Sequence, residues 1–87
     1  MTNMRKLTLI KRSIPRCPAC TMMQQALERE GVPHVTIDIT EDMDAIAQYG
    51  ISSIPVMIIE DADGTEIERL AGFHPAEAVA ELLKGER

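Results

Sequence analysis

Cys17 and Cys20, the two cysteines of the chain, enclose a proline and an alanine in the segment Arg16–Met23, RCPACTMM. Two sulfurs at this spacing can bind a metal ion, form a structural disulfide, or switch between dithiol and disulfide forms. A disulfide that closes so short a loop adds little stability, because it removes little entropy from the unfolded chain. The structural role is therefore disfavoured, and the metal and redox roles remain.

The ligands available for a metal ion are few. A structural zinc site needs about four ligands, and the cysteine pair supplies two of them. The only histidines, His34 and His74, lie far apart in the sequence, whereas paired histidine ligands are commonly about three to five residues apart. A redox-active pair needs no further ligand, so we favour it. A zinc site, an iron–sulfur cluster bridged between two chains, and a non-catalytic adaptor or metal carrier stay open as alternatives.

The position of the pair predicts two unequal sulfurs. Helical spacing of apolar residues begins at Pro18, which places Cys17 at the N-cap and Cys20 one turn further on the same face. The positive end of the helix stabilises a thiolate at Cys17, and Arg16 adds a positive charge. Pro18 suits the first helical position, and it withholds one N–H that would otherwise stabilise the thiolate. We expect Cys17 to attack a target disulfide and Cys20 to resolve the mixed disulfide.

The remaining patterns predict an α/β fold around this pair. The expected order is strand 4–11, helix 18–30, strand 35–39, helix 41–49, strands 55–60 and 65–70, and helix 75–83. Gly31 should end the first helix, Thr40 should cap the second, and Pro75 should stand at position N1 of the last. A β-α-β unit followed by a hairpin predicts a four-stranded mixed sheet flanked by three helices, in a single domain over residues 1–87.

Composition narrows the class of partner. The net charge of −5 and the single Tyr and single Phe argue against nucleic-acid binding and leave a mainly aliphatic core that should include Met22 and Met23. The acidic run from Glu60 to Glu68 should be a solvated hairpin face. More than half of the nine Lys and Arg residues lie within the first twenty residues, which contain no acid: Arg5, Lys6, Lys11, Arg12 and Arg16. The last three would form a basic rim that favours acidic partner segments.

The location of the protein is predicted from what the sequence lacks. No apolar run reaches the about 20 residues of a membrane span. The first twelve residues are interrupted by charges and have no small-residue cleavage site. We therefore expect a cytoplasmic protein, in a reducing compartment where a close cysteine pair is more often catalytic or metal-binding than structural.

The Cys-Pro-Ala-Cys segment after the first strand, the Ser53-Ile54-Pro55 loop before the third and the glycine before the last helix together resemble the thioredoxin-fold superfamily. The resemblance covers essentially the whole chain, and the small size points to its glutaredoxin and NrdH-redoxin branch. It implies a thioredoxin-like, glutaredoxin-type fold and a dithiol-disulfide oxidoreductase with Cys17 and Cys20 as catalytic residues. It also implies a cis Pro55 beside the sulfurs, and backbone pairing of Ile54 with an incoming peptide or glutathione.

Residues 70–75, Leu-Ala-Gly-Phe-His-Pro, resemble the Trp-Ser-Gly-Phe-Arg-Pro segment of NrdH redoxins, which take electrons from thioredoxin reductase and reduce ribonucleotide reductase. Gly72 and Phe73 are then substrate-binding candidates, together with Arg16, Ile54 and Pro55. The residues alone do not decide whether Phe73 is a core residue or part of a peptide groove. His74 should be a helix-start residue. Residues 7–12 lack the buried acid that thioredoxin carries before its cysteines.

The sequence differs at several positions from the pattern of glutathione-dependent glutaredoxins. Glutaredoxins usually have a Lys three residues before the first Cys and a Tyr between the cysteines, and Ile14 and Ala19 stand there. Lys11 or Arg12 could take the place of the Lys if the loop is longer. The acids that hold the glutathione amine are absent from residues 71–74. We expect a monomer without a bound cofactor, reduced by NADPH through thioredoxin reductase, with glutathione as the alternative donor.

Overall fold

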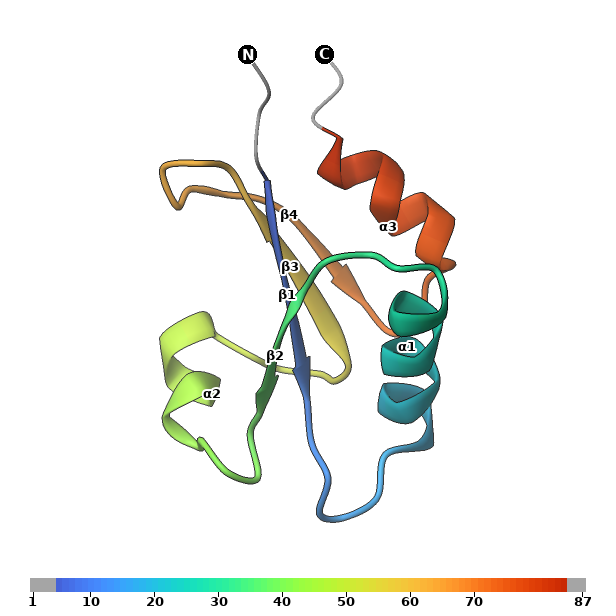
Figure 1. Ribbon diagram of the computed structural model, residues 1–87. Coiled ribbons are helices and arrows are strands. Elements are labelled where there is room, and N and C mark those ends of the chain that lie inside the picture. The colour runs from blue at the N-terminus through green and yellow to red at the C-terminus, as the bar shows by residue number, and fades with distance from the viewer. Residues whose placement is uncertain (1–4, 85–87) are drawn as a thin grey trace.

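The computed structural model describes residues 5–84, and its elements follow the predicted order β-α-β-α-β-β-α (Figure 1). Residue 4, where the first strand was expected to start, lies outside the described residues. The elements are β1 (Lys6–Lys11), α1 (Pro18–Arg29), β2 (Val35–Asp38), α2 (Asp44–Tyr49), β3 (Val56–Glu60), β4 (Glu66–Ala71) and α3 (Ala76–Leu83). Among residues 5–84, no helix has the length and apolar character needed to cross a membrane.

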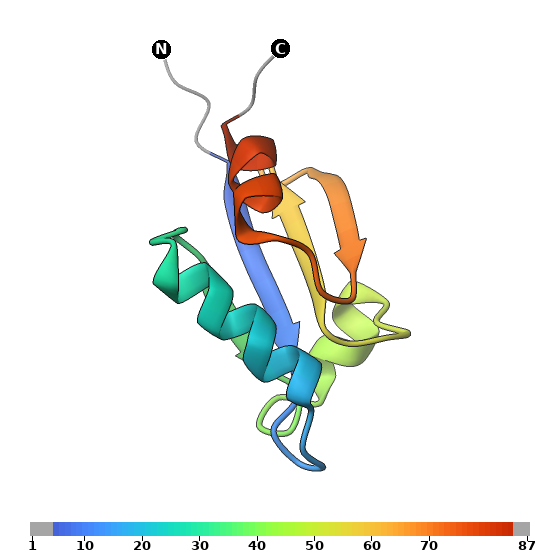
Figure 2. The same cartoon turned by 90° about the vertical axis from the view of Figure 1, so that its right-hand side faces the viewer.

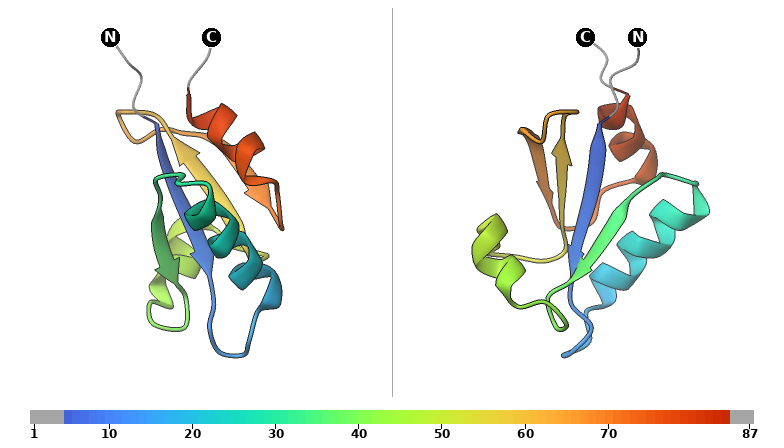
Figure 3. Two further views of the ribbon diagram at one scale, coloured as in Figure 1. Left: turned by 45° about the vertical axis from the view of Figure 1, so that its right-hand side comes forward. Right: turned by 60° about the vertical axis from the view of Figure 1, so that its left-hand side comes forward.

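The four strands form one mixed sheet in the order β2-β1-β3-β4. β1 runs parallel to β2 and antiparallel to β3, which in turn pairs antiparallel with β4. The parallel pair needs a crossover, and α1 supplies it. Helices α1 and α3 cover one face of the sheet and α2 covers the other (Figures 2 and 3). This is the thioredoxin-like arrangement that the sequence predicts.

The core lies on both faces of the two central strands, β1 and β3. Successive side chains of a strand point to opposite faces, so Leu7 and Leu9 face α1 and α3 whereas Ile10 faces the α2 side. Met57 and Ile59 of β3 divide from Val56 and Ile58 in the same way. The α1–α3 side is completed by Met23, Ala26, Leu27, Val32, Ala76 and Val79.

Met22 corrects the predicted core. We expected Met22 and Met23 to be buried together, but Met22 is 56% exposed and only Met23 is buried. Adjacent helical residues point about 100° apart at 3.6 residues per turn. The sheet therefore covers the side of α1 that carries Met23, Ala26 and Leu27 and leaves Met22 in solvent.

Two helix starts also differ from the prediction. Thr40 does not cap α2, which begins at Asp44, because its hydroxyl bonds instead to the backbone of Ser13 and Ile14. Pro75 is the N-cap of α3 rather than its first residue: its carbonyl accepts from Val79 while its ψ of 138° is not helical. Gly31 ends α1 as predicted, since it follows the C-cap residue with a φ of +67° that suits glycine.

The acidic hairpin also matches its prediction. The turn between β3 and β4 and most of the flanking acidic run are exposed. Asp61 and Asp63 hold this turn, because carboxylate oxygens of both accept the N–H of Thr65 at 3.0 Å.

Candidate redox site

Cys17 and Cys20 form a disulfide at the start of α1, with their Cα atoms 5.2 Å apart. Cys17 is the N-cap residue, as the sequence predicts, and its Sγ accepts the N–H of Cys20 at 3.1 Å. Its carbonyl accepts the N–H of Thr21 at 3.1 Å. Pro18 occupies the start of the helix and has no N–H to donate. Of the first amides of the helix, that of Cys20 therefore supplies the hydrogen bond to the sulfur.

The two cysteines differ in exposure to solvent. Cys17 retains 6% of its surface exposure, whereas Cys20 has none. The first turn of α1 contains no acidic residue, so no carboxylate there opposes a negative charge at Cys17. Of the two cysteines, Cys17 is therefore the one that keeps contact with solvent.

Strand register brings the other predicted segments to the same end of the sheet. The end of β1 pairs with the start of β3, Ile10 with Val56, and Val56 pairs with Ala71 at the end of β4. Three segments therefore meet at this end of the sheet: the one that leads to Cys17, the Ile54–Pro55 loop and the Gly72–His74 loop. The structure thus gathers segments that lie more than fifty residues apart in the sequence.

The Ile54–Pro55 bond is cis, as the resemblance implies, and so is the Ile14–Pro15 bond, which was not predicted. Pro55 is buried, and its carbonyl accepts the N–H of Gly72 at 2.7 Å. This hydrogen bond joins two of the loops that the sequence singled out for substrate binding.

The Gly72–His74 loop is also attached to α1. The N–H of His74 donates to Sδ of the buried Met23 at 3.4 Å, one turn beyond Cys20. Phe73 is 47% exposed, which answers the question left by its sequence: it is a surface residue and not a core residue. His74 directly precedes the N-cap of α3, as expected for a helix-start residue.

The three basic residues before Cys17 differ in what they contact. Lys11 extends to α1, where its Nζ donates to Oε1 of Gln24 at 3.1 Å. Arg12 folds back on its own loop, and its Nε donates to the carbonyl of Pro15 at 2.9 Å. Of the two candidates for the glutaredoxin lysine, Lys11 is therefore the one that contacts the redox helix. Arg16 is exposed next to Cys17.

Thr40 holds the segment that leads to Cys17, a role that the sequence did not reveal. Its Oγ1 accepts the N–H groups of Ser13 and Ile14, both at 3.0 Å, and donates to the carbonyl of Ile14 at 3.2 Å. The parallel register of Lys11 with Asp38 explains this contact, because it places the segments after β1 and β2 side by side.

Asp38 supports Thr40 from the end of β2. Its Oδ1 accepts the N–H of Thr40 at 2.9 Å. Partial burial acts to raise the pKa of Asp38, but hydrogen bonds from Ser13 and Thr40 and the charge of Lys11 outweigh it and hold the pKa below its usual value. The carboxylate therefore stays ionised down to lower pH than an ordinary Asp.

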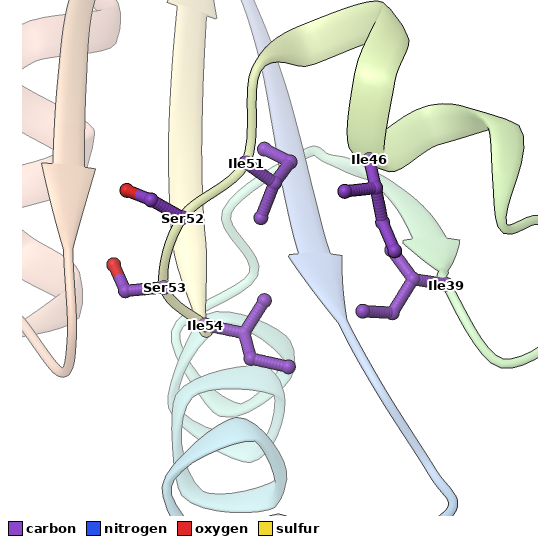
Figure 4. Close-up of a pocket in the computed structure, with 6 residues that line it drawn as sticks. All are labelled: Ile39, Ile46, Ile51, Ser52, Ser53 and Ile54. Atoms are coloured by element: carbon purple, nitrogen blue, oxygen red, sulfur yellow. The ribbon is translucent and has the colours of Figure 1, made fainter.

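A pocket of about 200 Å³ lies on the α2 side of the sheet, lined by Ile39, Ile46, Ile51, Ser52, Ser53 and Ile54. The isoleucine side chains point toward one another, whereas both serine hydroxyls point away from them (Figure 4). A neighbouring groove of about 330 Å³ shares Ile39 and Ile46 and extends to Arg12 and Ile14. Within residues 5–84, no three or more His, Cys, Asp or Glu side chains gather as metal ligands would.

The sequence model of the Glutaredoxin family matches residues 6–62, which include the cysteine pair and the Ile54–Pro55 loop. The chain belongs to the glutaredoxin family. It is a thioredoxin-fold dithiol-disulfide oxidoreductase, with the Cys17–Cys20 disulfide as its redox-active group. Membership of this family also implies, in general terms, that a reductase reduces the protein and that its substrates contain disulfides.

Two curated relatives come from Bacillus subtilis (strain 168). The SPbeta prophage-derived thioredoxin-like protein YosR is 36% identical over 78 residues, which cover 90% of this chain and 96% of the relative. Thioredoxin of the same strain is 33% identical over 75 residues, covering 79% of this chain and 71% of that protein.

Solved structures show the same fold at low sequence identity. A structure of thioredoxin-2 of a malaria parasite matches with a TM-score of 0.82 and 17% identity, covering 99% of this chain and 86% of that one. A mutant thioredoxin from Halobacterium salinarum NRC-1 matches with a TM-score of 0.79 and 22% identity, over 95% and 74% of the two chains. Both confirm the fold class.

Proposed function

We propose that Cys17 is the attacking sulfur of this oxidoreductase and Cys20 the resolving one. In the reduced protein, the Cys17 thiolate attacks one sulfur of a target disulfide and expels the other as a thiolate. The Cys20 thiolate then attacks the sulfur of Cys17, which releases the target as a dithiol and forms the Cys17–Cys20 disulfide. The observation that carries this assignment is the difference in exposure, 6% against none, at a helix N-terminus that favours negative charge on Cys17.

Two residues next to Cys17 adjust its thiolate in this proposal. The Arg16 guanidinium places a positive charge next to Cys17 and stabilises its thiolate. Pro18 limits the same effect because it leaves one helix N–H out of reach of the sulfur. Arg16 also contributes to substrate binding, with Ile54, Pro55, Gly72 and Phe73.

For the electron donor we propose an NADPH-dependent thioredoxin reductase, with a protein disulfide such as that of ribonucleotide reductase as the target, in the manner of NrdH redoxins. The exposed Phe73 beside Gly72, on a loop attached to α1, supports this proposal. Ile14 and Ala19 stand where a glutathione-dependent glutaredoxin has Lys and Tyr. Glutathione is the second candidate donor, supported by the family match over residues 6–62. The proposal places a monomeric, single-domain protein in the cytoplasm.

NADPH oxidation with insulin as the disulfide substrate compares the two donors. One arm supplies thioredoxin reductase, and the other supplies glutathione with glutathione reductase. We expect turnover with thioredoxin reductase that is lost in Cys17→Ser and in Cys20→Ser. Turnover in the glutathione arm alone would replace the proposed donor, and turnover by Cys17→Ser would overturn the assignment of the attacking sulfur.

A further inference from the structure

Three large apolar side chains, one in the segment before Cys17 and two at α2, remain in solvent. Ile14 is 74% exposed, Met43 is 70% exposed and Ile46 is 37% exposed. All three line one groove of about 330 Å³, which Arg12 and Ile39 also border. We call Ile14, Met43 and Ile46 the apolar shelf. Exposed apolar side chains that adjoin one another are typical of surfaces that bind a partner, whereas single ones need no explanation.

The shelf is held in place before any partner arrives. The N–H and C=O of Ile14 both bond to the hydroxyl of Thr40, at 3.0 and 3.2 Å. Arg12 fixes the following residue through its 2.9 Å hydrogen bond to the carbonyl of Pro15. The backbone of the most exposed isoleucine is thus ordered three residues before Cys17. A side chain on an ordered backbone binds a partner with a smaller loss of conformational entropy.

The two ends of the shelf carry opposite charge. At the Cys17 end, Arg12 uses N–H groups on carbonyl oxygens, and within the described part of the chain neither Arg12 nor Arg16 forms an ion pair. At the α2 end, Glu41, Asp42 and Asp44 are exposed around Met43. A partner segment with a carboxylate is therefore attracted to the Cys17 end and repelled from the α2 end.

We propose that the apolar shelf docks a segment of the target protein in which an aliphatic side chain lies beside a carboxylate. The aliphatic side chain covers Ile14, Met43 and Ile46, and the carboxylate faces Arg12 and Arg16. The docked segment has to present its disulfide to Cys17, so the inference rests on the function proposed above. The shelf is separate from Ile54, Pro55, Gly72 and Phe73, which were assigned above to substrate binding, and only Arg16 belongs to both sites. The shelf acts as a second specificity determinant beside these residues.

Chromogenic peptide disulfides test this proposal without a reductase. Each peptide carries a cysteine that is linked through a disulfide to 5-thio-2-nitrobenzoate. A two-residue unit, Leu–Asp, Ser–Asp or Leu–Lys, is placed two to four residues before or after this cysteine, and each position is one register. The reduced protein releases the thionitrobenzoate, and 5,5′-dithiobis(2-nitrobenzoate) serves as the small reference disulfide. In the best register, we expect the Leu–Asp peptide to react about tenfold faster than Ser–Asp. Leu–Asp should also react several-fold faster than Leu–Lys.

Variants assign this preference to the shelf. The double variant Ile14→Ser/Met43→Ser should lower the ratio of the Leu–Asp rate to the reference rate about tenfold. Ile67→Ser, at a 38% exposed isoleucine on β4, should keep the wild-type ratio. Arg16→Glu should reverse the preference between Asp and Lys, and both peptides are measured in the same variant so that any change in the Cys17 thiolate cancels.

The outcomes separate the two proposals. If no peptide register responds to Leu, or if the double variant keeps the wild-type ratio, the shelf is not a docking site for the target. A double variant that keeps the ratio but converts a dimer into a monomer would identify the shelf as an interface between two copies. If the wild type fails to reduce even the reference disulfide, the proposed redox function fails, and the shelf loses its basis with it.

Discussion

Replacement of Thr40 by Val removes the hydroxyl that holds the segment between β1 and Cys17, while the β-branched shape of the side chain is kept. The change deletes two accepted hydrogen bonds of 3.0 Å, from Ser13 and Ile14, and one donated bond of 3.2 Å to the Ile14 carbonyl. The backbone hydrogen bond from Thr40 to Asp38 does not involve the hydroxyl and should persist. The variant therefore tests the hydroxyl alone.

The magnitude follows from the number and exposure of these bonds. A net contribution of about 0.5–1.5 kcal/mol is typical for one intramolecular hydrogen bond. All three bonds are exposed, so water can replace the hydroxyl as a partner of each backbone group. We therefore take the low end for each bond and expect Thr40→Val to reduce the free energy of unfolding by about 1–2 kcal/mol.

Urea unfolding measures the loss of stability, and the peptide disulfides described above measure its effect on function. Because Ile14 belongs to the apolar shelf, Thr40→Val should also lower the ratio of the Leu–Asp rate to the reference rate. Thr40→Ser keeps the hydroxyl and should restore most of both quantities. A Thr40→Val variant with wild-type stability and a wild-type rate ratio would refute the view that this hydroxyl orders the segment.

Three further predictions concern stability. Leu27→Ala, at a fully buried position facing the sheet, should cost about 2–5 kcal/mol in urea unfolding, and a cost below about 1 kcal/mol would contradict the described core. Gly50→Ala, at a C-cap with φ of +63°, should cost about 1 kcal/mol, and an unchanged midpoint would show that the residue is not left-handed. Asp38 has a pKa below that of the unfolded chain, so its stabilising contribution is present above pH about 3.9 and is lost as the pH falls through the folded-state value. Asp38→Asn should therefore be less stable than the wild type at pH 7, with a difference that shrinks in acid, and a difference independent of pH would contradict this.

The sequence predicted the elements whose signals are local. Gly31 marks the end of α1 because a left-handed residue there favours glycine, and Pro18 marks the start because its missing N–H is not needed at that position. The N-cap position of Cys17 followed from the helical spacing that begins at Pro18. Helical periodicity was less accurate for Met22, because it predicts an apolar stripe but not how much of that stripe the sheet covers.

Features that depend on packing between distant segments were not predicted. Thr40 has the residue type and the following acids of a helix cap, and only the parallel pairing of β1 with β2 brings its hydroxyl to Ile14 instead. Phe73 could not be assigned to core or surface, because a single aromatic residue has no periodicity. The apolar shelf combines residues from two loops and α2, so its members have no common sequence pattern.

Trapping of the covalent intermediate identifies the attacking sulfur. Reduced Cys20→Ser is mixed with a peptide disulfide, and the adduct is digested and mapped by mass spectrometry. We predict a stable mixed disulfide on Cys17, because the variant lacks the sulfur that resolves it, and no adduct on Cys20 when Cys17→Ser is treated in the same way. An adduct on Cys20 in Cys17→Ser that forms as fast as the one on Cys17 would contradict the assignment of Cys17 as the accessible, attacking sulfur.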